Sequence, residues 1–93
     1  MVKVEYYYSP VCPYCPMARR VVSEAVGKYS DVEYEEVNTY TEDGIKRGLA
    51  LNLMSVPAVV VNGIIRLIGF PFSVDDVVKC IEEAGHSDLY ISP

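Results

Sequence analysis

Two cysteines separated by two residues, Cys12 and Cys15, are the side chains of this 93-residue chain best suited to chemistry. An apolar run over residues 2–8 precedes them and a helical pattern over residues 17–26 follows, so the pair lies between a strand and a helix. A helix N-terminus carries unpaired N–H groups and a partial positive charge, which favour a thiolate over a thiol. Such a site lowers a cysteine pKa from ~8.5 to about 3.5–7.5. We therefore predict a dithiol–disulfide redox pair, with Cys12 as the nucleophile and Cys15 as the resolving thiol.

A pair with this spacing is also compatible with half of a zinc site or with two buried structural thiols. Haem attachment is excluded, because Pro16 and not histidine follows Cys15. A zinc site needs about four ligands, and the remaining candidates, Cys80 and His86, lie far along the chain. The strand–helix junction favours redox chemistry, so we expect no bound metal and no bound cofactor.

Composition restricts the partners and the compartment. The net charge of −5 argues against nucleic acid or an anionic membrane surface as a partner. No stretch approaches the roughly 20 apolar residues of a membrane span, and the first residues lack the pattern of a signal peptide. An odd number of cysteines, three, does not suit a fully paired secreted scaffold. We therefore expect a cytoplasmic protein, and the acidic composition favours a monomer.

The hydrophobic pattern predicts an α/β domain over residues 1–85 with elements in the order β-α-β-α-β-β-α, and a short C-terminal tail at residues 86–93. Asn62-Gly63 lies between two β-rich runs and predicts a hairpin with a type I′ turn. A strand–helix–strand unit at the start of the chain is expected to be parallel and right-handed. The predicted strands lie at 2–8, 32–37, 58–61 and 64–68, with helices beginning near residues 15, 39 and 73.

The second helix has the weakest pattern. Thr39 and Glu42 have the spacing of a capping box. Gly44 and Gly48 each weaken a helix by about 1 kcal/mol relative to alanine. Apolar side chains nevertheless recur at helical spacing, at Ile45, Leu49 and Leu53.

Together these residues resemble the thioredoxin superfamily. The likeness rests on Cys12-Pro13-Tyr14-Cys15, on Ser55-Val56-Pro57 and on the hairpin that follows. It is strongest to the small archaeal thioredoxin/glutaredoxin-like proteins, and Cys-Pro-Tyr-Cys is the typical glutaredoxin active-site sequence. The resemblance implies a thioredoxin/glutaredoxin fold, with a four-stranded mixed sheet of order 2-1-3-4 flanked by three helices.

The resemblance also assigns roles at the predicted site. On its residues alone, Pro57 is an ordinary proline at a strand start, and only about 5–6% of X–Pro bonds are cis. The resemblance implies that the Val56–Pro57 bond is cis and lies against Cys12, and that the Val56 backbone pairs with the substrate. Tyr14, between the cysteines, is expected to be exposed and to touch the partner. Cys12 would attack a disulfide and Cys15 would resolve the mixed disulfide.

Departures from the family pattern bear on the electron donor. Ser9 stands where glutaredoxins usually carry lysine, and Gly69-Phe70-Pro71 replaces their glutathione-holding Gly-Gly and acidic residue. Tyr6 occupies the place of the buried acid of thioredoxins. We therefore expect a protein-disulfide reductase that is recharged by a thioredoxin-reductase-type flavoprotein. The alternatives are a glutathione-dependent glutaredoxin and a metal- or partner-binding module on the same fold.

Overall fold

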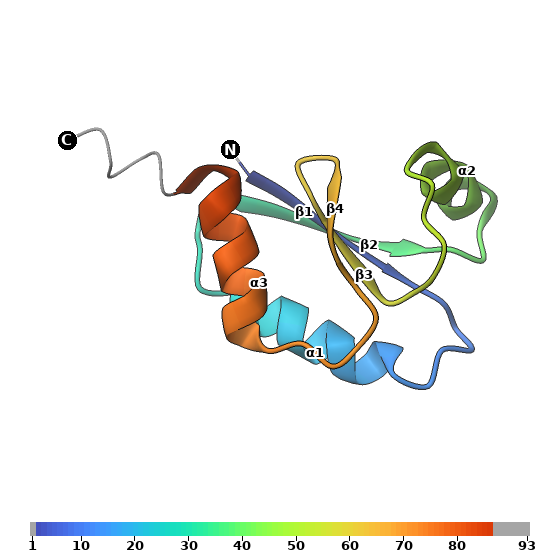
Figure 1. Cartoon of the computed structure of the whole chain (residues 1–93), viewed down its shortest axis with the longest axis horizontal. Coiled ribbons are helices and arrows are strands. Elements are labelled where there is room, and N and C mark those ends of the chain that lie inside the picture. The colour runs from blue at the N-terminus through green and yellow to red at the C-terminus, as the bar shows by residue number, and fades with distance from the viewer. Residues whose placement is uncertain (1, 87–93) are drawn as a thin grey trace.

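The computed structural model describes residues 2–86 and has the predicted order of elements (Figure 1). The predicted tail lies outside the described residues from 87 onward, and residue 86 closes the last helical turn. Within residues 2–86 the elements are β1 (Val2–Tyr8), α1 (Cys15–Val26), β2 (Val32–Asn38), α2 (Glu42–Ala50), β3 (Ala58–Val61), β4 (Ile64–Ile68), α3 (Val74–Ile81) and a short helical extension, η1 (Glu82–His86).

The strands form one mixed sheet of order β2-β1-β3-β4, which confirms the predicted order. β1 runs parallel to β2 and antiparallel to β3, and β3 runs antiparallel to β4. The α1 crossover makes the first pair parallel. Asn62 and Gly63 have φ angles of 52° and 81°, both positive as a type I′ turn requires, so the predicted hairpin is confirmed.

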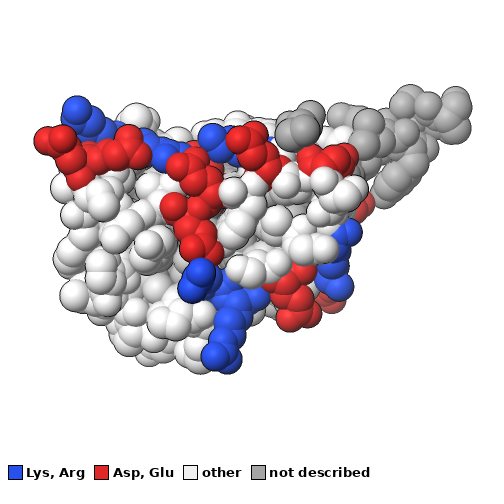
Figure 2. All heavy atoms as spheres, turned by 180° about the vertical axis from the view of Figure 1, so that it is seen from behind, with Lys and Arg blue, Asp and Glu red and all other residues white. Residues whose placement is uncertain are grey.

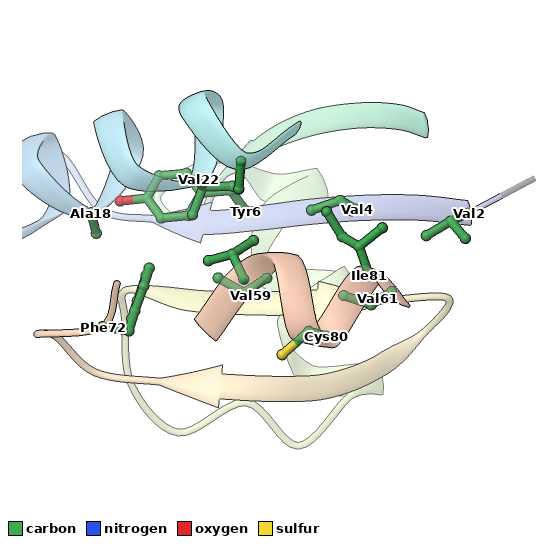
Figure 3. Close-up of a cluster of buried hydrophobic side chains, with 12 residues drawn as sticks. Val2, Val4, Tyr6, Ala18, Val22, Val59, Val61, Phe72, Cys80 and Ile81 are labelled. Atoms are coloured by element: carbon green, nitrogen blue, oxygen red, sulfur yellow. The ribbon is translucent and has the colours of Figure 1, made fainter. Parts of the chain in front are cut away.

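The main hydrophobic core lies between the sheet and the pair α1 and α3. Ala18 and Val22 of α1 are fully buried in the same cluster as Val4 and Tyr6 of β1, and Figure 3 shows Val22 beside the Tyr6 ring. The apolar side of the helical pattern predicted over residues 17–26 therefore faces the sheet. The same cluster takes in Val77, Cys80 and Ile81 of α3.

The opposite face of the sheet is covered by α2 and the loop that follows it. The predicted capping box is wrong: the N-cap is Thr41, whose Oγ1 accepts the Gly44 N–H at 2.9 Å. Thr39 instead donates its hydroxyl to the Tyr8 carbonyl at 2.9 Å, because it directly follows β2, beside the end of β1. The helix ends at Ala50, so Leu53 lies beyond it.

The apolar positions of α2 do not form its buried stripe. Ile45 and Leu49 are exposed, whereas Gly44 and Gly48 are the buried residues of this helix. A side chain at position 44 would collide with the Asn38 main chain, so glycine is what lets α2 approach β2 this closely. None of the helices within residues 2–86 has the length and hydropathy to cross a membrane.

Candidate active site

The two cysteines lie where β1 passes into α1. Ser9 shapes this turn: its Oγ accepts the Val11 N–H at 3.1 Å, and its carbonyl accepts the Cys12 N–H at 3.2 Å. Cys12 is partly buried, and Cys15 is only 3% exposed. The two residues form a disulfide with their Cα atoms 5.4 Å apart. The Cys12 side chain is therefore more accessible to solvent than the Cys15 side chain.

Cys15 is the first residue of α1, and Pro16 follows it in the first turn, where its missing N–H costs little. Tyr14 is the N-cap, and its exposed side chain makes no capping hydrogen bond. Cys12 precedes the helix within the turn, and its carbonyl accepts the Cys15 N–H at 3.4 Å. In the reduced protein, the partial positive charge of the helix N-terminus therefore favours a thiolate in this turn.

A cavity of about 200 Å3 adjoins both cysteines, and Arg19 forms part of its wall. The Arg19 Nε donates to Glu36 Oε2 at 2.7 Å, and the Tyr34 hydroxyl donates to the same oxygen at 3.0 Å. The Glu36 carboxylate offsets most of the arginine charge. The cationic contribution to a Cys12 thiolate therefore comes mainly from the helix.

The other predicted site residues lie in the loop before β3. The Val56–Pro57 bond is cis, Pro57 is buried, and Val56 is partly exposed. The Pro57 carbonyl accepts the Gly69 N–H at 2.7 Å, which ties this loop to the residue after β4. A second cis bond, Phe70–Pro71, was not predicted, because an isolated X–Pro pair carries no signal that separates cis from trans.

An apolar groove of about 360 Å3, which the sequence did not predict, lies beside the cysteine turn. Ser9 and Val56 are among its lining residues, and Ser9 also lines the cavity next to the cysteines, so the two hollows adjoin. Figure 2 shows a wide surface without charged side chains at the lower left, where α1 starts, whereas charged side chains lie above it at the upper left, where α2 lies. Four exposed apolar side chains contribute to the lining of the groove, those of Tyr40, Ile45, Leu49 and Met54. We call these four residues the α2 groove residues.

Cys80 lies on α3, away from this turn, and is buried in the main core. Burial raises the pKa of its thiol. The predicted alternative of a zinc site would also need His86, whose side chain is outside the described part of the chain. Among the described residues, no three His, Cys, Asp or Glu side chains gather in a way that could hold a metal.

Comparisons with known proteins agree with this geometry. Residues 2–82 match the model of the thioredoxin domain family. A relative called a probable thioredoxin in Methanothermobacter marburgensis is 39% identical over 72 residues, which cover 76% of this chain and 82% of the relative. A thioredoxin of Methanocaldococcus jannaschii is 39% identical over 71 residues, covering 75% of this chain and 81% of that protein.

A solved structure of oxidised thioredoxin O2 from Arabidopsis thaliana has the same fold. It superposes with a TM-score of 0.70 at 21% identity, over 89% of this chain and 74% of that one. The predicted family and fold are therefore confirmed by independent sequence and structural likeness. With its Cys12–Cys15 disulfide at the strand–helix junction, this chain belongs to the thioredoxin family, a family of protein-disulfide reductases.

Proposed function

We propose that this protein reduces disulfides of other proteins through Cys12 and Cys15, and that a thioredoxin-reductase-type flavoprotein restores its dithiol. The observation that carries the proposal is the unequal burial of the two bonded cysteines, next to an apolar groove. A partly exposed thiolate meets an incoming disulfide more readily than a buried one. Cys12 is accordingly the nucleophile and Cys15 the resolving thiol.

The reaction has two displacements. The Cys12 thiolate attacks one sulfur of the substrate disulfide, forming a mixed disulfide and releasing the first substrate thiolate. Cys15, as a thiolate, then attacks the Cys12 sulfur, forms the Cys12–Cys15 disulfide and releases the second substrate thiolate. The two released thiolates take up protons. The substrate gains two electrons and the dithiol loses two.

The groove supports a protein as the substrate. Its volume, about 360 Å3, falls at the lower end of the roughly 300–1,000 Å3 of ligand pockets, and its exposed apolar lining suits the side chain of an unfolded or extended polypeptide. We propose that such a segment crosses the Val56 main chain, that Pro57 shapes this loop, and that Tyr14 contacts the segment on the far side of Cys12. The proposal includes a monomer acting in the cytoplasm, without a bound cofactor.

The deciding experiment is reduction of a protein disulfide, such as that of insulin, with dithiothreitol or glutathione as the only reductant. Fast turnover with dithiothreitol and little with glutathione would support the proposal. Comparable turnover with glutathione would assign the protein to the glutaredoxins, as its Cys-Pro-Tyr-Cys sequence suggests. If neither reductant supported turnover, the proposed reductase function would be wrong. Metal analysis of the reduced protein would then test the alternative of a metal-binding module.

A further inference from the structure

Tyr6 connects the central part of the sheet to the resolving cysteine. Its side chain is fully buried, and its hydroxyl donates a hydrogen bond of 2.6 Å to the main-chain carbonyl of Cys15. Figure 3 shows the ring lying along α1 with its oxygen directed towards the beginning of that helix, near Ala18. The phenol therefore reaches from β1 to the first residue of α1 across the turn that carries Cys12.

The main chain of Tyr6 is held in place within the sheet by its two neighbouring strands. β1 is paired on both edges, with β2 and with β3, and Tyr6 lies opposite Glu36 and Val59 in those registers. Burial, together with the negative charge of Glu36, raises the pKa of Tyr6 to about 12. The hydroxyl consequently keeps its proton at neutral pH and remains a donor to the Cys15 carbonyl.

The other end of the connection is less constrained. The N-cap of α1, Tyr14, provides no side-chain capping bond, and the Cys12 turn is held mainly through Ser9. While the mixed disulfide exists, Cys12 is bonded to the substrate and no longer to Cys15. The Cys15 sulfur must then meet the Cys12 sulfur in line, and small displacements of a reacting group are costly.

We propose that Tyr6 is a positioning residue for Cys15, which speeds resolution of the mixed disulfide without taking part in the first attack. The inference rests on the proposed reductase function. It assigns no proton transfer to the phenol: the bond that forms is Cys12–Cys15, and the leaving group is the substrate thiolate. Tyr6 acts only through the main chain of Cys15.

The test uses stopped-flow mixing of the reduced protein with an aromatic disulfide that releases a coloured thiolate in each displacement. Excess reagent makes the attack by Cys12 fast, so the rate of the second thiolate release measures the resolution of the mixed disulfide by Cys15. The Cys15→Ser variant should show only the first release. In Tyr6→Phe we expect the second release to be about tenfold slower than in the wild-type protein, which corresponds to the loss of one hydrogen bond of ~1.4 kcal/mol. The rate of the first release should stay within about twofold of the wild-type rate. Phenylalanine preserves the ring that packs in the core.

Tyr29→Phe is the matched control. It removes the phenol hydrogen bond from Tyr29 to Glu82, beyond the C-terminal end of α1, without touching Cys15 or the residues around it. Neither release should change in this variant. An unchanged second release in Tyr6→Phe would overturn the proposal, and so would equal slowing of both releases, which indicates general loosening. Failure of the proposed function would look different: the wild-type protein would release no coloured thiolate at all.

Discussion

Gly44 lies against the main chain of Asn38 with no room for a side chain between them. A Cβ atom at position 44 would lie 2.7 Å from the Asn38 carbonyl carbon, well inside ordinary contact distance. Asn38 ends β2 and Gly44 lies in the first turn of α2, so this contact seats the helix on the sheet. The position of α2 in turn defines one wall of the apolar groove.

Replacing Gly44 should therefore destabilise the fold. We expect Gly44→Ala to lower the free energy of unfolding by about 1–3 kcal/mol, the usual cost of overpacking. Gly48→Ala is the matched control, because its Cβ would meet the Leu53 side chain at an ordinary 3.9 Å. That change should raise stability by up to about 1 kcal/mol through helix propensity. Urea unfolding measures both; the explanation is wrong if Gly44→Ala proves as stable as the wild-type protein.

Acid should weaken the contact between α2 and the sheet. Arg47 of α2 binds both carboxylate oxygens of Glu35, at 2.7 and 2.9 Å, and also pairs with Glu5 and Asp43. The hydrogen bond from Arg47 lowers the pKa of Glu35 from 4.5 to about 2. A carboxyl group whose pKa is lower in the folded protein stabilises the fold when the pH lies above its unfolded-state pKa, here about 4.5. This stability is therefore lost as the pH falls from about 4.5 towards 2.

Arg47→Met should remove that contribution. Since Glu35 is substantially exposed, solvent screens the pair, and we expect a loss of about 1 kcal/mol at pH 7. Between pH 4.5 and 2 the variant should lose less stability than the wild-type protein does. Lys46→Met, at the exposed neighbouring position on α2, is the control. Unfolding curves across this pH range are the measurement, and parallel pH profiles for Arg47→Met and wild type would contradict the assignment.

The two cysteines should fail in different ways. Cys12→Ser should abolish turnover with a protein disulfide, because it removes the attacking thiolate. Cys15→Ser should still attack but remain joined to its substrate, because no second thiolate releases the mixed disulfide. Intact mass spectrometry without reductant distinguishes the two outcomes. Retained turnover in Cys12→Ser would mean that the nucleophile has been assigned to the wrong residue.

The apolar groove should affect the reduction of protein disulfides and leave the reduction of small disulfides unchanged. Ile45→Asp places a charge among the α2 groove residues, and we expect the KM for insulin to rise about tenfold through lost apolar contact. The rate with a small aromatic disulfide should stay unchanged. Ile64→Asp is a matched control at the hairpin, where isoleucine is similarly exposed, 62% against 51%. Equal effects of the two substitutions on the KM would show that the groove does not bind the substrate.

Cys80 should remain inert while the protein is folded. It lies in the core, and burial raises the pKa of its thiol, so little thiolate is present near neutral pH. After reduction, iodoacetamide at pH 7 should label Cys12 well before Cys80, and full labelling of Cys80 should require denaturant. Peptide mass spectrometry reads the sites directly. Native labelling of Cys80 at the rate of Cys12 would show that the α3 side of the core opens readily.

Much of the fold follows from local patterns in the chain. The apolar run in residues 2–8, the helical pattern of residues 17–26 and the Asn62-Gly63 turn each specify their element through contacts between near neighbours. The second helix was predicted less accurately. Its cap is Thr41 and not Thr39, because the Thr39 hydroxyl binds the Tyr8 carbonyl, a partner 31 residues away that no local pattern encodes.

By itself, the sequence determined the family, the order of the elements and the Cys12–Cys15 pair at the start of a helix. The tertiary structure decided what surrounds that pair. It buried Gly44 and turned Ile45 outward, which left an apolar groove beside Ser9. It also brought the Tyr6 hydroxyl onto the Cys15 carbonyl. The physical reason is that spacing along the chain specifies periodicity and turns, whereas contacts between separate elements depend on how closely those elements pack.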